Sequence, residues 1–70
     1  MNGNEFLKRL KQYAKARELT LEFVARRGKG SHGTVYLVDR RTTLKDRKKE
    51  IGVGLLGSML DDLGIDPQDF

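Results

Sequence analysis

The strongest candidate for chemistry in this chain is a short glycine-rich, positively charged segment that contains its one histidine, His32. Gly28, Gly30 and Gly33 remove side chains there, so a phosphate could approach the backbone N–H groups directly. The neighbouring residues expected to grip that phosphate are Arg26, Arg27, Lys29, Gly30 and Ser31. These residue types predict a phosphate-binding bend that carries one group able to accept a proton.

The imidazole of His32 is suited to act as a general base on RNA. Histidine is the side chain that most often serves as a general base, because its neutral imidazole can accept a proton. Removing the proton from a ribose 2′-OH lets that oxygen attack the adjacent phosphorus, which cuts RNA without a metal and leaves a cyclic phosphate. Lys29 and the loop amides could stabilise charge on the phosphate oxygens. Water, Lys29 and Tyr36 all remain candidates for the general acid, and an ordinary surface or RNA-stacking role for His32 is the alternative.

A nucleotide-binding function does not fit the same residues. The stretch "GKGSHGTVYL" matches the G-x-G-x-x-G-x-V pattern of protein kinases, but 70 residues cannot hold the two lobes that a kinase needs. In a dinucleotide-binding fold the glycines must open a helix, whereas here they lead into "TVYLV", which is typical of a strand. The P-loop pattern is absent from the sequence.

Charge is distributed unevenly along the chain. All 14 Lys and Arg lie in residues 1–50 with six acidic residues, so that part carries +8, while the last 20 residues contain four aspartates and no base. A basic body attracts polyanions such as RNA through counterion release, although a solvated surface has the same composition.

Composition also limits cofactors and location. With no cysteine and one histidine, we expect no disulfide, no metal centre and no cofactor. The N-terminal stretch "MNGNEFLKRL" has no long apolar run, so we expect no signal peptide or membrane association and a cytoplasmic location.

Hydrophobic periodicity predicts the elements that position the glycine-rich segment. An amphipathic helix is expected over residues 5–17 with Asn4 as its N-cap and a basic outer face. Strands are expected in "TLEFVARR" and "GTVYLV", joined as a hairpin, followed by a turn at "DRR" and a shorter strand "TTLK". A charged connector, "DRKKE", leads to the second helix.

The second helix is expected over residues 52–63 on the spacing of its leucines and methionine. Gly64 is predicted to form a left-handed cap on which Ile65 packs, and "DPQDF" to form a short turn capped by Asp66 whose Phe70 plugs the core. Gly57 is expected to pack closely on the sheet or to fray. Asp61 and Asp62 lie at the wrong end of the helix dipole, so we expect them to be solvated or to contact a basic partner.

The predicted fold class is therefore α+β, a single domain over residues 1–70. Its order α-β-β-β-α places two helices on one face of a three-stranded antiparallel sheet and leaves the other face exposed. Double-stranded RNA-binding domains share this architecture, and they recognise RNA by its shape and backbone.

The run "KGSHGTVYL", followed by "TTLKDRKKEIGVGLLGSMLDDLGI" and "DPQDF", resembles the HicA family, the small toxins of bacterial toxin–antitoxin pairs. This resemblance covers nearly the whole chain. It implies a fold like that of a double-stranded RNA-binding domain and a ribosome-independent mRNA endonuclease. The family's catalytic histidine falls on His32 and its loop glycine and serine on Gly30 and Ser31. The resemblance also implies a HicB-type antitoxin partner and a complex that acts on its own operator DNA. One position departs from the family pattern: Gly33 stands where relatives often carry a larger or charged residue.

The leading hypothesis is thus a metal-independent RNase toxin with His32 as its base. The alternatives are a non-catalytic RNA-binding module of the same fold and, more remotely, an interaction subunit that binds a protein through its basic face.

Overall fold

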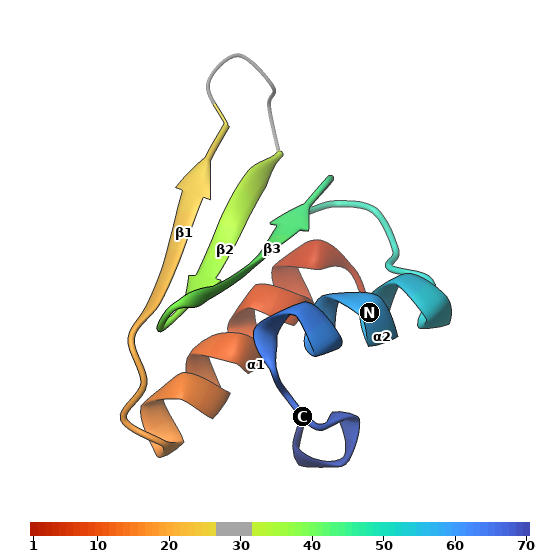
Figure 1. Ribbon diagram of the computed structural model, residues 1–70. Helices are drawn as coiled ribbons and strands as arrows, with labels where there is room; N and C mark the ends of the chain where they lie inside the picture. The colour runs from red at the N-terminus through yellow and green to blue at the C-terminus, as the bar shows by residue number, and fades with distance from the viewer. Residues whose placement is uncertain (27–31) are drawn as a thin grey trace.

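The computed structural model describes residues 1–26 and 32–70 as one α+β domain (Figure 1). In chain order the elements are α1 (Gly3–Ala16), β1 (Leu21–Ala25), β2 (Gly33–Leu37), β3 (Arg40–Leu44), α2 (Val53–Leu63) and the short 3-10 helix η1 (Pro67–Asp69). The strands form one antiparallel sheet in the order β1-β2-β3. The predicted fold class is confirmed.

The strand register sorts the side chains onto two unlike faces. Val35 pairs with Thr42 and with Phe23, and these residues point toward the helices. Alternate positions of β2, such as Thr34 and Tyr36, point the other way. The burial of β2 follows this alternation, because its odd-numbered residues are buried and its even-numbered ones are only partly covered.

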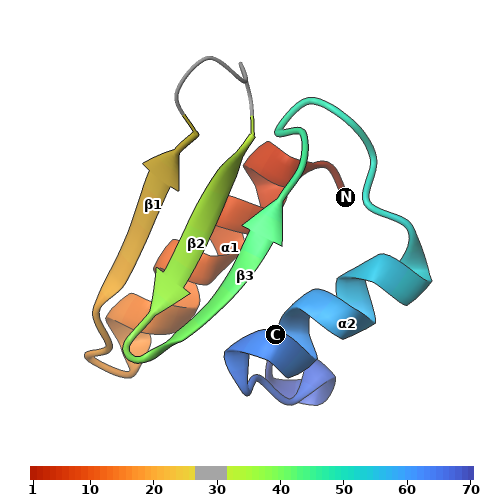
Figure 2. The same cartoon turned by 45° about the horizontal axis from the view of Figure 1, so that its top comes forward.

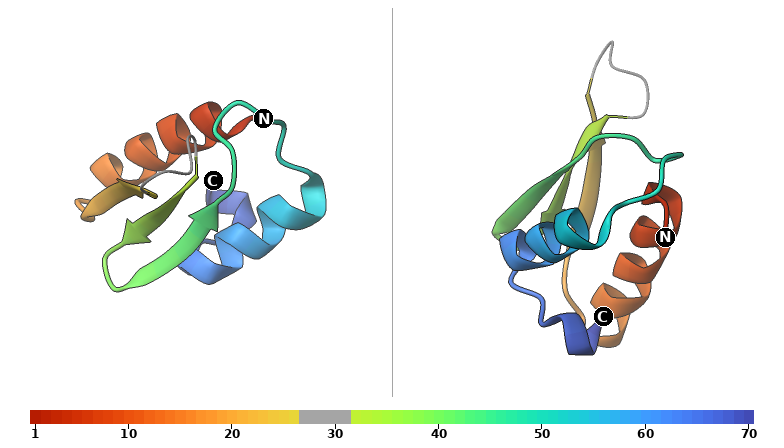
Figure 3. Two further views of the ribbon diagram at one scale, coloured as in Figure 1. Left: turned by 90° about the horizontal axis from the view of Figure 1, so that it is seen from above. Right: turned by 90° about the vertical axis from the view of Figure 1, so that its right-hand side faces the viewer.

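Both helices cover the same face of the sheet, with α1 behind β1 and β2 and α2 alongside β3 (Figures 2 and 3). The core between the layers is made of aliphatic side chains and one aromatic ring: Phe6, Leu10, Ala14, Val35, Leu37, Leu44, Ile51, Met59, Leu60, Leu63 and Ile65. Because burial is one-sided, the far face of the sheet is available for binding.

Helix α1 begins earlier than the sequence predicts. Asn2, not Asn4, is its N-cap, and the Asn2 side chain and Glu5 form a reciprocal capping box with N–H···O distances of 2.9 and 3.0 Å. The Asn4 N–H instead donates to the carbonyl of Arg47 at 2.8 Å. Gly3 allows this approach, because a Cβ there would lie 2.6 Å from the Arg47 Cα. The start of α1 is therefore fixed by the charged connector.

The hairpin between β2 and β3 is tighter than predicted. Its loop contains only Val38 and Asp39, so β3 begins at Arg40 and not at the predicted "TTLK" segment. Val38 adopts a left-handed φ of 58°, which two-residue hairpins require but a β-branched residue rarely adopts. That unusual choice of residue is why the sequence pattern misplaced the turn.

Helix α2 ends as predicted. Gly64 has φ 72°, and the Ile65 N–H donates to the Leu60 carbonyl at 2.9 Å, as in a Schellman motif. The Arg40 side chain supplies the missing cation, since its guanidinium donates to the carbonyls of Asp62 at 2.9 Å and Asp61 at 3.1 Å. A side chain of β3 thus holds the main-chain carbonyls of the two aspartates, a contact that the sequence did not suggest.

At two positions of α2 the structure departs from what the apolar pattern suggests. Gly57 does not pack on the sheet, because a Cβ there would meet no atom within 4 Å. Leu55, although it falls on the predicted apolar stripe, is 46% exposed. The sheet has only three strands and its β3 edge reaches the later turns of α2, so the first turns project beyond it (Figure 2).

The C-terminal segment closes the domain as predicted. Asp66 caps η1 by accepting a hydrogen bond from Gln68 N–H at 3.0 Å, and Phe70 packs on Phe6 with ring centroids 5.5 Å apart. The guanidinium of Arg9 lies 5.0 Å from the Phe70 ring centroid. Neither helix of the described chain combines the length and apolar character needed to span a bilayer.

A paired glycine substitution tests how the sheet is packed. A Cβ on Gly33 would lie 2.5 Å from the Phe23 ring and 2.7 Å from the Val24 carbonyl oxygen. We predict that Gly33→Ala lowers the free energy of unfolding by about 1–3 kcal/mol through overpacking. The control, Gly57→Ala, should raise it by up to about 1 kcal/mol, because alanine favours helix and space is free. Urea unfolding followed by circular dichroism measures both, and equal stability of the Gly33 variant and the parent would contradict this packing.

Candidate active site

His32 lies directly before β2, on the exposed side of the hairpin that joins β1 and β2. The N–H of Arg26 donates to the His32 carbonyl at 2.7 Å, so the ladder continues one pair beyond the strands. This pairing places Arg26 directly opposite His32 on the sheet. The structure therefore brings together two of the predicted site residues, the base and one cation.

The same alternation assigns both residues to the face that the helices leave uncovered. Positions 22, 24 and 26 of the first strand pair with 36, 34 and 32, and positions 41 and 43 of β3 pair with 36 and 34. We call this surface the open face, and its residues are Glu22, Val24, Arg26, His32, Thr34, Tyr36, Arg41 and Thr43. It offers an imidazole, two guanidinium groups, one carboxylate, hydroxyls and one aromatic ring in a single layer.

The other predicted site residues lie outside the described residues. These are Arg27, Lys29, Gly30 and Ser31, together with Gly28. Their roles as phosphate ligands stay predictions from the sequence.

Gly33 has a different role from the one expected. We predicted that it would help to clear space for a phosphate, but its missing Cβ faces the helix side, where the Phe23 ring and the Val24 carbonyl fill the space. Gly33 is fully buried. It therefore supports the strand beside His32 and does not form part of a phosphate cradle.

A polar pocket at the β3 edge continues the open face, and sequence reasoning did not identify it. It has a volume of about 320 Å³ and is lined by Thr34, Arg41, Thr42, Thr43 and Asp62. The Thr42 hydroxyl donates to the Asp62 carboxylate at 2.9 Å. The one available signal was the run of two arginines followed by two threonines at residues 40–43, which was assigned partly to a turn.

The position of Tyr36 bears on the question of the general acid. Residues of an extended strand rise about 3.4 Å each, so Tyr36 lies about 14 Å from His32 along β2. The attacking and leaving oxygens of a single phosphodiester are much closer together than that. Tyr36 is thus better placed to contact a neighbouring nucleotide than to protonate the leaving oxygen.

Metal-binding side chains do not gather on the open face. Among residues 1–26 and 32–70, no three His, Asp or Glu side chains are grouped to hold a metal ion. The carboxylate of Asp62 at the pocket edge is engaged by Thr42. The described part of the site can thus offer cations and hydroxyls to a phosphate, and one base.

Comparison of this chain with protein-family models, with curated proteins and with solved structures finds no match. Three features bear on function: the register of the sheet, the side chains of the open face and the sequence pattern around His32.

Proposed function

We propose that this chain is a metal-independent endoribonuclease, the toxin of a HicA-type toxin–antitoxin pair that cuts mRNA in the cytoplasm. The single observation that carries the proposal is the place of His32, exposed at the end of the open face and opposite Arg26. A general base must reach the proton that it removes, and an exposed position beside a cation gives access to a ribose next to a phosphate. The resemblance of the sequence around His32 to the HicA family agrees with this assignment.

In the proposed reaction, His32 takes the proton of a ribose 2′-OH while the 2′-oxygen attacks phosphorus and the bond to the 5′-oxygen breaks. Arg26 lies across the ladder, where its guanidinium can offset charge that builds on the phosphate oxygens. Lys29, Ser31 and the amide of Gly30 are proposed to add donors. The leaving oxygen takes its proton from water or Lys29.

The rest of the open face is proposed to hold the RNA strand. Tyr36 presents a partly exposed ring on which a base can stack, and Arg41 lies directly beside it in the register. Thr34 and Thr43 form the adjacent cross-strand pair and offer hydroxyls to the backbone. Shape and phosphate contacts of this kind carry little sequence information.

Partners follow from the same proposal. A HicB-type antitoxin would inhibit the enzyme by covering the open face, and the pair would contact operator DNA through the antitoxin.

The second candidate function is a non-catalytic RNA-binding module. One observation favours it: Tyr36 and Arg41 are cross-strand partners, and an aromatic ring beside a guanidinium can stack a base and bind a phosphate without any catalyst.

Removing the imidazole separates these two functions. We predict that His32→Ala slows cleavage of a single-stranded RNA about 10²- to 10⁴-fold, the range for losing a general base, while its RNA affinity stays near that of the parent. Cleavage by the parent should continue in EDTA. Asp39→Ala, an exposed change in the turn at the far end of the sheet, is the control and should cleave normally.

Two results would contradict the catalytic assignment. One is a His32→Ala variant that cuts as fast as the parent. The other is a purified parent that binds RNA but never cuts it, which would establish the binding module instead. A parent that neither binds nor cuts RNA would point to the interaction subunit.

The salt dependence of RNA binding tests the open face directly. Each phosphate neutralised by a cation adds to the fall of affinity with salt, so we predict that Arg41→Ala reduces the slope of log K against log salt by about 1. Arg17→Ala is the control, because Arg17 lies at the end of α1, away from the open face, where its guanidinium is 3.9 Å from the Tyr13 ring centroid. Equal slopes for the Arg41 and Arg17 variants would show that RNA binds elsewhere.

A further inference from the structure

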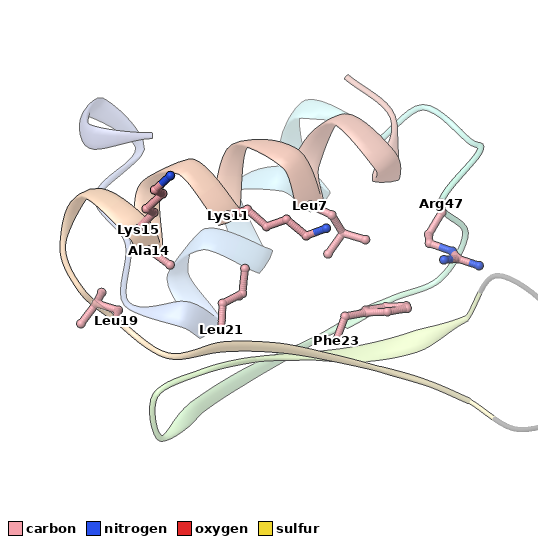
Figure 4. Close-up of a pocket in the computed structure, with 8 residues that line it drawn as sticks. All are labelled: Leu7, Lys11, Ala14, Lys15, Leu19, Leu21, Phe23 and Arg47. Carbon is pink, nitrogen blue, oxygen red and sulfur yellow. The ribbon is translucent and has the colours of Figure 1, made fainter.

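A groove runs between α1 and β1 on the helix side of the sheet, away from the open face (Figure 4). It has a volume of about 380 Å³. Its apolar part is formed by Leu7, Leu19, Leu21 and Phe23, and three cationic residues, Lys11, Lys15 and Arg47, also line it. All four apolar side chains are only partly buried, so the groove presents apolar surface that the domain itself does not cover.

Among the described residues, no carboxylate forms an ion pair with the cations that line the groove. Within residues 1–26 and 32–70, the one ion pair joins the amino group of Met1 to Glu50. Arg47 instead lies over the Phe23 ring, with its guanidinium carbon 5.4 Å from the ring centroid. Lys11 extends along the groove beside Leu7, toward Phe23 (Figure 4). An occupant that combines apolar groups with negative charge would complement this groove.

The β1 edge beside the groove also offers unpaired backbone groups. The bonds Val38 N–H to Thr20 O, at 2.9 Å, and Arg26 N–H to His32 O, at 2.7 Å, show that the even-numbered residues of β1 bond to β2. The N–H and C=O groups of Leu21, Phe23 and Ala25 therefore point outward. In the part of the chain that the structure describes, no backbone or side-chain group bonds to them.

The opposite edge of the sheet differs in chemistry. Beside β3 lies the polar pocket, lined by threonines, Arg41 and the Asp62 carboxylate. An exposed strand edge is a template for pairing with another strand, and natural proteins usually block such edges. At β1 the unblocked edge coincides with uncovered apolar side chains and unneutralised cations.

We propose that the β1 edge and the α1–β1 groove together bind an extended acidic segment of a partner protein, which adds a fourth, antiparallel strand to the sheet. Main-chain bonds to Leu21 and Phe23 would give affinity. Every second side chain of the added strand would enter the groove, where apolar residues meet Leu7 and Leu19 and flanking acids meet Lys11 and Arg47. The proposal does not depend on RNA cleavage at His32.

Two other occupants fit the groove less well. A second copy of this chain, paired edge to edge, would bring Lys11 and Arg47 toward the same cations of its partner. RNA would satisfy the cations, but its phosphates would lie against the uncovered apolar side chains. An acidic strand satisfies the backbone groups, the apolar surface and the charge together.

The probe is a capped peptide with the sequence Glu-Thr-Val-Thr-Val-Thr-Glu, in which valines face the groove, glutamates flank them and threonines face outward. Titrated into the ¹⁵N-labelled full chain, it should bind with a Kd below about 1 mM. We expect shifts of the amide signals of Leu21, Phe23 and Ala25, together with slowed hydrogen exchange at these three amides.

Backbone methylation of the peptide tests the strand register. In an antiparallel pair, the residues whose side chains enter the groove also direct their N–H groups at β1. N-methylation of both valines should therefore abolish binding. N-methylation of the two flanking threonines is the matched control and should be tolerated, because their N–H groups point away from the sheet.

A charge exchange tests the cations. The double variant Lys11→Glu, Arg47→Glu should bind the peptide about tenfold more weakly than the parent does. A peptide with lysines in place of its glutamates should restore the affinity for this variant. Lys11→Glu alone provides a milder version of the test if the double variant is unstable. Arg41→Glu, on the open face, should leave peptide binding unchanged.

Several results would overturn the proposal. One is no saturable binding at 1 mM peptide, and another is a set of shifts confined to the open face. A single-stranded RNA that protects the same three amides would assign the groove to RNA. Protection that grows with protein concentration alone would assign it to a second copy.

Discussion

The structure depends on the fixed register between β1 and β2 at the end of the hairpin, where the Phe23 ring lies over Gly33. A Cβ at Gly33 would lie 2.5 Å from that ring and 2.7 Å from the Val24 carbonyl oxygen, so glycine lets the two strands keep this pairing without a shift. A shift of one residue would move every side chain of a strand to the other face. The contact thus places Val35 in the core, Thr34 and Tyr36 on the open face, and His32 at its end.

The register matters because only one face of the sheet is buried. The core, from Phe6 to Ile65, lies entirely between the sheet and the helices. Arg40 and Thr42 hold the end of α2 beneath β3 through the carbonyls and carboxylate of the last helical turn. Because the helices, connector and C-terminus pack on the same side, the described residues leave two surfaces of different chemistry uncovered: the polar open face and the α1–β1 groove.

Much of the fold could be predicted from the sequence because the patterns were local. Apolar spacing identified both helices, alternation identified β1 and β2, and Gly64 with Asp66 identified the last two caps. The errors arose where contacts between residues distant in the sequence determine the bounds of an element. Asn2 caps α1 because the connector at Arg47 and Glu50 binds that end of the helix, and Val38 adopts a turn conformation that its residue type disfavours. The pairing of Arg26 with His32 followed from the hairpin, whereas the placing of Arg41 and Thr43 beside Tyr36 and Thr34 needed the β3 register.

In the proposed reaction an exposed imidazole activates a 2′-oxygen, and the chemistry of the cut ends tests this step most directly. Attack by the 2′-oxygen leaves a 2′,3′-cyclic phosphate on one fragment and a 5′-hydroxyl on the other. Mass spectrometry of the fragments of a defined RNA, cut by the purified chain, should detect these termini, and none should form when the residue before the cut is 2′-deoxy. Fragments that end in a 3′-hydroxyl and a 5′-phosphate would show that water was the nucleophile, and His32 would not have the role assigned to it.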